Sequence, residues 1–378
     1  MGYSETMCQL CGVSFAIARI RRAGEPEEAA WTYTGSGYVD EVADTCGEFS
    51  GCQALERADL ENGFVGSGEE HISGPGCICT LGYCGYRIST QEMRGCRAMQ
   101  CLLKKEDNWE TESDDQDLER ESGYFLTGLG DGSPNEAPLG DISPDDDPTP
   151  ALPFHPTCFE IFKKVSASRL GRVDVHGLWM WRQIEHEYED FFENFPRSLA
   201  VRNGCEQWWC HEPGNEYLAA NPIDIPGFSE LLKSCGRDFT WSNAKKIQPL
   251  KTTTKKGHST PPPTTHSDMF GKLPLELRDM VLDHLSAKDI ANLRRTTMSF
   301  RQLPVVLFRR LLLEDMPFLW EAQDMPVGTT DWFRLYKAVK GCWQDLNGVK
   351  NRKRIWKDVN EIVNRVERYK KEGKILDE

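Results

Sequence analysis

The segment from residue 106 to residue 147 limits the possible folds most, because it divides the chain into two parts. It contains 15 acidic residues and a single basic one, Arg120, and Pro, Gly and Ser make up much of the rest. Such a segment cannot bury enough apolar surface to offset the entropy lost on ordering. We therefore predict a disordered acidic loop over residues 104–150, and a solvated loop is favoured over an interaction tail.

The remaining regions predict an α+β multidomain protein, because 378 residues are enough for two or three domains. A loop-rich, Cys-rich N-terminal region is predicted to pack with an aromatic-rich middle region, and Lys, Thr and Pro then mark an extended linker. An all-α module and a C-terminal helical region follow. The predicted bounds are 1–103 for the Cys-rich region, 151–242 for the middle region, 243–267 for the linker, 268–315 for the helical module and 316–378 for the C-terminal helices.

The net charge of −14 is unevenly distributed along the chain. Residues 1–267 hold 24 Lys and Arg against 42 Asp and Glu, whereas residues 268–378 hold 21 against 17. The acidic first part argues against nucleic-acid binding by bulk charge. We find no apolar stretch of membrane-spanning length and no secretory signal pattern, so a reducing cytoplasmic or nuclear location is expected.

Cysteines in a reducing compartment are more often metal ligands or buried thiols than disulfides. Cys8 and Cys11, followed by Gly12, have the form of a zinc knuckle, which supplies two of the four ligands that a structural zinc needs. The best complement is His155 and Cys158, because Cys158 begins a helix whose dipole favours a thiolate. We therefore predict a structural Zn²⁺ site of Cys8, Cys11, His155 and Cys158. The alternative is a free N-terminal thiol pair and a loop histidine.

The other cysteines and histidines do not form a familiar motif. The group from Cys46 to Cys101 is interpreted as buried thiols rather than a second metal site, because no His-x-Cys spacing completes it. Cys210 and His211 are adjacent in sequence, which is not the geometry that a catalytic pair needs. No phosphate-binding loop or hydrolase motif occurs, so the chain is predicted not to be an enzyme. The basic run at residues 350–354 could serve nuclear import or phosphate contact, but a solvated helix face is favoured.

Three short helices are predicted between residues 273 and 308. Pro274 suits the first turn of a helix, and Ser286 is a good N-cap for the next one. Ser299 and Gln302 have capping-box spacing for a third helix, although Pro304 argues against its being regular from the first turn. Such a unit is too small to bury much core alone, and a partner surface would help it. One helical face carries Leu277, Val281 and Leu285, and the next carries Ile290 and Leu293.

This order of elements resembles the F-box, as seen in the Leu273-Pro274-Leu275-Glu276 start and the Asp289-Ile290-x-x-Leu293 segment. F-boxes dock onto the small adaptor of Skp–cullin–F-box ubiquitin ligases, so the resemblance implies a non-catalytic subunit that presents a protein substrate for ubiquitination. It departs from the family in the third helix, where Met298-Ser299-Phe300-Arg301 replaces the usual Cys-Arg-x-Trp-Arg. The residues expected to form or support the adaptor-facing surface are Leu273, Pro274, Leu277, Val281, Leu285, Ile290 and Leu293.

The N-terminal motif strengthens the resemblance, because fungal F-box proteins often open with Cys-x-x-Cys-Gly and later carry Phe-His-Pro-x-Cys-Phe, here at residues 154–159. Two alternatives remain open. The helices could be an ordinary hairpin within a larger domain, or the chain could be a zinc-module transcriptional or nucleic-acid-binding protein. No internal repeat is present, so the sequence does not identify a substrate-binding array.

Overall fold

The computed structural model describes residues 6–31, 46–56, 69–106, 109–110, 117–130, 151–185, 195–203, 211–236, 268–341 and 343–376. The chain divides into two compact units, of which the first contains Met1–Pro226 and Asp345–Glu378 and the second Gly227–Gln344. The predicted α+β class is confirmed, and the predicted C-terminal region contributes to both units. The predicted linker and much of the predicted acidic loop lie outside the described residues, but the described part of that loop contains a helix at Asp117–Glu121 and a strand at Tyr124–Leu126 that pairs with β5 (Gln100–Lys104). No helix within these ranges is both long and apolar enough to cross a membrane.

Short strands form three small sheets in the first unit. One pair is parallel, a second pair is antiparallel, and the third sheet has three antiparallel strands with β5 at its centre. The pairs are β1 (Arg19–Ile20) with β4 (Tyr83–Cys84) and β2 (Gln53–Glu56) with β3 (Glu69–Ile72); β5 (Gln100–Lys104) lies between β6 (Tyr124–Leu126) and β7 (Leu152–Phe154). Strands this short need further packing or cross-links to be stable.

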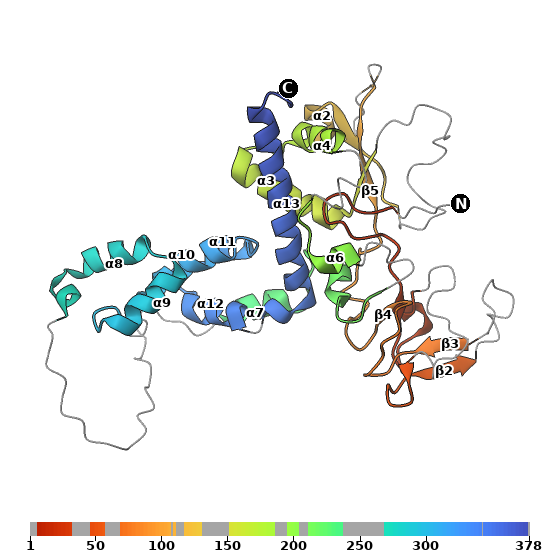
Figure 1. The fold of residues 1–378 in the computed structure, drawn as a ribbon, viewed down its shortest axis with the longest axis horizontal. Coiled ribbons are helices and arrows are strands. Elements are labelled where there is room, and N and C mark those ends of the chain that lie inside the picture. The colour runs from red at the N-terminus through yellow and green to blue at the C-terminus, as the bar shows by residue number, and fades with distance from the viewer. Residues whose placement is uncertain are drawn as a thin grey trace. The chain divides into compact units, whose positions relative to one another are not determined.

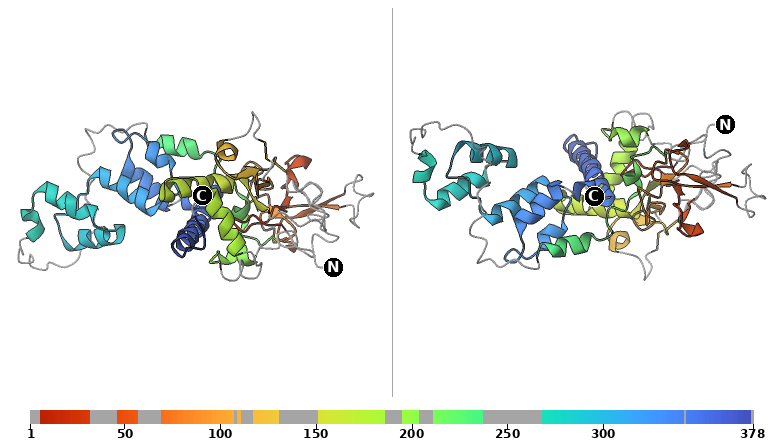
Figure 2. Two further views of the ribbon diagram at one scale, coloured as in Figure 1. Left: turned by 90° about the horizontal axis from the view of Figure 1, so that it is seen from above. Right: turned by 90° about the horizontal axis from the view of Figure 1, so that it is seen from below.

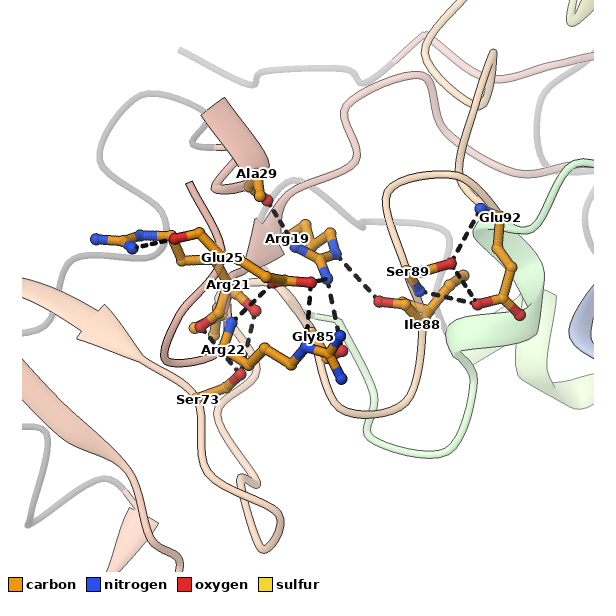
Figure 3. Close-up of polar contacts among 11 residues, drawn as sticks. Arg19, Arg21, Arg22, Glu25, Ala29, Ser73, Gly85, Ile88, Ser89 and Glu92 are labelled. Atoms are coloured by element: carbon orange, nitrogen blue, oxygen red, sulfur yellow. Dashed lines mark hydrogen bonds and ion pairs between the residues drawn. The ribbon is translucent and has the colours of Figure 1, made fainter. Parts of the chain in front are cut away.

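Arg19 in β1 organises the loops around the first pair of strands, as Figure 3 shows. Its buried guanidinium donates to the carbonyl oxygens of Ile88 at 3.1 Å and Ala29 at 2.7 Å, and to the Glu25 carboxylate at 2.9 Å. Ala29 ends the short helix η1 (Glu27–Ala29). A buried charge is tolerated only when its donors are satisfied. The acceptors of Arg19 come from three loops with little regular structure, so its side chain links these loops.

The long C-terminal helix α13 (Asn347–Lys371) is the main support of the first unit. It packs against α3 (Pro156–Leu170), α4 (Val175–Ile184) and η3 (Glu216–Ala219), and the views in Figures 1 and 2 agree on its position beside α3 and α4. Burying each large apolar side chain of its inner face stabilises the unit by about 1.5–3 kcal/mol. The predicted amphipathic stripe is confirmed, because its members are all buried: Ile355, Val359, Ile362, Val366 and Tyr369.

A close approach between α4 and α13 depends on Gly177. A Cβ atom at this position would lie 2.6 Å from Cγ1 of Val366 and 2.4 Å from the Asp174 carboxylate, which caps α4 by accepting the N–H of Gly177. Both distances are below any real contact, so only glycine fits. Two further short helices complete this unit: α2 (Asp117–Glu121) and α6 (Leu199–Asn203).

The second unit is helical throughout its described residues. Its core contains Phe300, Phe308, Leu312 and Trp332, and Phe308 packs edge-on against the Phe333 ring. The side chain of Arg310 donates to Leu282 O in the helix Leu275–Asp283 and to Leu285 O just after it. The helices are α7 (Phe228–Ser234), η5 (Met269–Lys272), α8 (Leu275–Asp283), α9 (Ala287–Thr296), α10 (Val305–Asp315), α11 (Glu321–Asp324), α12 (Trp332–Gly341) and η6 (Trp343–Asp345).

The helix starts lie within a residue of the prediction except at the third helix, but α8 ends at Asp283, so Leu285 lies beyond the helix on whose face it was predicted. Ser286 caps α9 as predicted, because its hydroxyl accepts the N–H of Asp289. Ser299 does not cap α10, which begins only after Pro304. The prediction was wrong because Pro304 favours an extended residue before it, so a helix cannot run through from Ser299. Ser299 instead donates its hydroxyl and backbone N–H to the Asp268 carboxylate, at 2.7 and 2.8 Å.

Candidate metal centre and helical surface

The structure brings Cys8, Cys11, His155 and Cys158 into one group, although the acidic loop separates the two pairs in sequence. Their ligand atoms all lie within 4.8 Å of one another. Nδ1 of His155 is 3.5 Å from the Cys11 sulfur and 3.8 Å from the Cys158 sulfur. Ligands bound tetrahedrally to one zinc lie about 3.5–3.8 Å apart, given Zn–S and Zn–N bonds of about 2.3 and 2.0 Å. The four side chains are therefore arranged as one metal ion would require.

Local backbone geometry explains how each pair presents its ligands. Gly12 has a φ of 71° and donates its N–H to Cys8 O, which closes the turn between Cys8 and Cys11. His155 precedes the first turn of α3 and Cys158 lies within it, so both face the same point. The backbone N–H of His155 also approaches the Cys8 sulfur at 3.4 Å. Amide N–H groups directed at sulfur favour the thiolate form that binds metal.

Burial and mutual contacts shift the pKa values of this group in opposite directions. Burial raises the pKa of Cys158 well above its usual value, and hydrogen bonds with Cys11 and Cys8 raise it further. Burial also opposes ionisation of Cys11, but hydrogen bonds with Cys158 and Cys8 hold its pKa well below the usual range. The negative charge of Cys8 and Cys11 outweighs burial and raises the pKa of His155 to about 10. A divalent cation would let all three thiols ionise beside a neutral imidazole. The residues present thus fit a metal ion.

The metal group leaves no room for a substrate. All four residues are buried, and Cys8 is fully so. The cavity bordered by Cys11, His155 and Cys158 has a volume of about 20 Å³, far below the several hundred Å³ of a small-molecule site. A metal bound by all four side chains would have no open position, which is the arrangement of a structural site rather than a catalytic one.

A buried cluster of charged side chains binds the backbone carbonyl groups of the Cys8–Cys11 turn. Arg197 donates to Leu10 O at 3.0 Å, and Arg354 of α13 donates to Cys11 O at 2.8 Å. Asp358, one turn further along α13, lies 3.4 Å from Arg197 and 3.2 Å from Arg354. The carboxylate thus neutralises part of the charge of two guanidinium groups that position the metal-binding turn.

This cluster corrects part of the interpretation of the basic run at residues 350–354 as a solvated helix face, because Lys350 and Lys353 are exposed but the other three residues are not. Arg352 and Arg354 are buried, with exposed fractions of 0% and 8%, and Asn351 is 2% exposed. Arg352 donates to the carbonyl oxygen of Pro222. Sequence cannot distinguish a solvated basic run from one that satisfies buried carbonyl oxygens, because both have the same composition.

Replacing Asp358 with alanine should destabilise the first unit by about 3–5 kcal/mol, since two buried guanidinium groups would lose their anion. Chemical denaturation would measure the loss. Glu361→Ala is the matched control, because Glu361 lies on the same helix but pairs with Arg365 at its partly exposed edge. It should cost less than about 1 kcal/mol. Equal losses in the two variants would contradict a special role for Asp358.

A second group of possible ligands was missed by sequence analysis. Cys46, Cys52, His71 and Cys77 also have ligand atoms within 4.8 Å of one another. The sequence predicts that these cysteines are buried thiols, because no His-x-Cys spacing completes a ligand set for them. Two groups among the described residues, each with three cysteines and one histidine, could therefore hold a metal ion.

His211 has a structural role rather than a catalytic one. Its Nε2 accepts the N–H of Ala18 at 3.0 Å, and its ring packs edge-on against Tyr83 with centroids 4.7 Å apart. Cys210, the other member of the Cys–His pair considered from sequence, lies outside the described residues. Burial lowers the pKa of His211 to about 3, so the imidazole is neutral at pH 7 and can accept this hydrogen bond.

His211 should make the first unit sensitive to mild acid. Its folded pKa of about 3 lies below the unfolded value of about 6.5, so its contribution is fully present above pH 6.5 and is lost as pH falls toward 3. At pH 5 the loss should be about 2 kcal/mol. Urea unfolding would give the free energy of unfolding at pH 7 and at pH 5. The decrease between the two should be smaller for His211→Gln than for the natural protein, because glutamine keeps an acceptor but does not titrate. Identical differences would count against this assignment.

Helix α8 exposes an apolar face in the second unit. Leu277 and Met280 are 45% and 56% exposed, and their spacing of three places them on one side of the helix. Met280 was missed in the sequence analysis, although its spacing from Leu277 could have identified it. Among the residues predicted to form or support this surface, Pro274 and Leu277 are exposed, Ile290 is buried, and Leu273, Val281, Leu285 and Leu293 are half-buried.

Comparison with protein families supports a specific interpretation of this unit. The model of the F-box domain matches residues 270–304, which run from η5 through α8 and α9 to the residue before α10. F-box proteins are typically non-catalytic, and the match supports an adaptor-binding role. Comparisons with the curated proteins and with the solved structures returned no match. The fungal-type Cys and His motifs are suggested only by the two groups of side chains described above.

Proposed function

We propose that this protein is an F-box substrate-recognition subunit. Its second unit docks on the Skp-type adaptor of a cullin ubiquitin ligase, and the protein presents a bound substrate for ubiquitination. It carries no catalytic residue of its own. The expected location is cytoplasmic, nuclear or both.

The exposed apolar face of α8 carries the proposal, together with the F-box match that covers it. Contiguous apolar patches exposed on a protein surface often mark sites of protein–protein interaction. Pro274 and Leu277 lie at this surface, and Leu273, Val281 and Leu285 extend it inward. Ile290 and Leu293 support it through α9. An adaptor helix or groove that buries Leu277 and Met280 would supply the hydrophobic core of a stable interface.

The first unit is proposed to contain a structural Zn²⁺ bound by Cys8, Cys11, His155 and Cys158. When bound, the ion supplies a cross-link between the N-terminal turn and the start of α3. Arg197, Arg354 and Asp358 hold that turn against α13. In this interpretation the unit is a rigid platform whose exposed surface is available to a substrate. Acceleration then comes from positioning, because a held substrate lysine has a high effective concentration near the transfer site.

The test is direct binding of the full chain to a purified Skp-type adaptor by size-exclusion chromatography and calorimetry. A one-to-one complex is expected, and transfer of ubiquitin to captured proteins should then require both partners. Failure to form the complex at micromolar concentrations would contradict the receptor function. The alternative of nucleic-acid binding loses support because Arg352 and Arg354, which would make phosphate contacts, are buried.

A further inference from the structure

The second group of cysteine and histidine side chains has the dimensions of a tetrahedral metal site. The Cys46 sulfur is 4.0 Å from the Cys77 sulfur and 3.8 Å from Nε2 of His71. The Cys77 sulfur is 3.9 Å from the same nitrogen. These distances are close to the edges of a tetrahedron of sulfur and nitrogen ligands around zinc, about 3.5–3.8 Å. The Cys52 sulfur completes the group within 4.8 Å.

The burial of three of its members distinguishes this group from a chance cluster of side chains on the surface. Cys77 and His71 are 0% and 1% exposed, and Cys46 is 8% exposed. The imidazole of His71 is the one nitrogen donor of the group. Its Nε2 faces the sulfur atoms of Cys46 and Cys77. The imidazole nitrogen is thus held against two thiols on the buried side of the group, and the fourth member, Cys52, is partly exposed.

The backbone brings the ligands together through close packing of two loops. The loop after β3 crosses the segment before β2 so tightly that a Cβ on Gly74 would lie 2.2 Å from the carbonyl carbon of Gly51. Gly51 itself has a φ of 73°. This contact places the N–H of Gly74 3.3 Å from the Cys52 sulfur, and the N–H of Cys77 bonds to Gly74 O. Amide donation to a sulfur favours the thiolate.

The same loop is fixed to the first sheet, so the group does not depend on a mobile tip. Ser73 donates its N–H to Arg21 O at 2.8 Å and its hydroxyl to Arg21 O at 3.1 Å, as Figure 3 shows. Arg21 in turn donates two hydrogen bonds to the Glu70 carboxylate of β3, at 2.6 and 2.8 Å. Two ligands, His71 and Cys77, thus flank an anchored segment.

We propose that Cys46, Cys52, His71 and Cys77 bind a second structural zinc ion. It would tie the four-residue ribbon of β2 and β3 to the loop after it, in a region where such short strands are not stable alone. Three thiolates and one imidazole in a tetrahedral arrangement suit Zn²⁺, whereas hard cations such as Mg²⁺ and Ca²⁺ prefer oxygen ligands. This site lies within the first unit and does not depend on the adaptor-binding function.

Cys84 is the residue that could replace one member of the set. Cys84 is buried in the same cluster as Cys46 and Cys77, and its thiol donates to Gly74 O at 3.7 Å. The geometry favours Cys52 over Cys84, because only Cys52 lies within 4.8 Å of all three other ligands. The experiment therefore includes both residues.

Zinc content of the purified full chain, measured by mass spectrometry against protein concentration, tests the proposal. Two equivalents are expected for the natural sequence, and about one for Cys52→Ser, since the ion bound by Cys8, Cys11, His155 and Cys158 remains. Cys84→Ser should keep two. Cys101→Ser is the matched control, because Cys101 is a buried thiol of β5 outside both groups, and it should also keep two.

A second variant separates loss of metal from loss of folding. His71→Cys retains four ligands and should keep two equivalents of zinc. When cobalt replaces zinc, the thiolate-to-metal absorbance of this variant should exceed that of the natural protein by about the contribution of one thiolate ligand. The proposal is overturned if Cys52→Ser keeps two equivalents, or if Cys84→Ser loses one. It is also overturned if the folded natural protein holds a single zinc while Cys46, Cys52 and Cys77 react as free thiols. Adaptor binding measured on the same samples should be unchanged in Cys52→Ser, so the two proposals succeed or fail separately.

Discussion

Cys158→Ser should abolish the cooperative folding of the first unit while leaving the second unit folded. Structural zinc sites of this ligand type contribute about 10–16 kcal/mol at pH 7, which equals or exceeds the 5–15 kcal/mol by which a typical domain is stable. Removing one of four ligands also leaves two thiols and an imidazole buried without a cation. Among the described residues, the N-terminal turn also reaches the segment before α3 through the hydrogen bond from Gln9 N–H to Pro153 O at 2.9 Å, but such a bond contributes only about 1 kcal/mol.

Hydrogen exchange measured by mass spectrometry would detect this change unit by unit. Peptides from α3 and α13 should lose protection in Cys158→Ser, and peptides from α10 and α12 should retain it, because none of the four ligands belongs to the second unit. Cys101→Ser is the control, since it removes a buried thiol from the same unit without touching a ligand. Retained protection in α3, together with one fewer zinc, would show that the ion contributes little to folding.

The ligand pairs differ in how far sequence could predict them. Cys8 with Cys11, and His155 with Cys158, could be recognised because each pair is a short local motif whose spacing sets the geometry. The prediction that the pairs meet required only that a long loop close, which costs little more than a short one. The second group contains no such pair. Its ligands converge because Gly74 packs against Gly51, and a contact between distant backbone segments leaves no periodic signal in the sequence.

Buried charge was the other feature that sequence analysis missed. The apolar stripe of α13 was predicted because Ile355 and Val359 recur at helical spacing and need only a hydrophobic neighbour. Arg354 and Asp358 have the same spacing, which on a solvated helix is an ordinary ion pair. Their burial depends on Arg197 and on the carbonyl oxygens of the metal-binding turn, which belong to other parts of the chain. Such partners cannot be inferred from one helix.

Adaptor binding is the property that the exposed face of α8 should control. Replacing both Leu277 and Met280 with aspartate should weaken binding to the Skp-type adaptor at least about 100-fold, because truncating a central apolar anchor typically costs 2 kcal/mol or more. The added carboxylates would also have to be desolvated within the interface. Both side chains are substantially exposed, so the unfolding temperature of the second unit should hardly change.

The control must show that the effect belongs to α8 rather than to any exposed apolar residue of the same unit. Val327→Asp provides it, because Val327 is 44% exposed, close to the 45% of Leu277, but lies between α11 and α12. Calorimetry should give an affinity within about twofold of the natural protein for this variant, as expected for a residue outside the interface. If Val327→Asp weakens binding as much as the α8 variant, the docking surface extends beyond α8. If the α8 variant binds normally, the adaptor contacts another face, and the exposed apolar residues of α8 need a different partner.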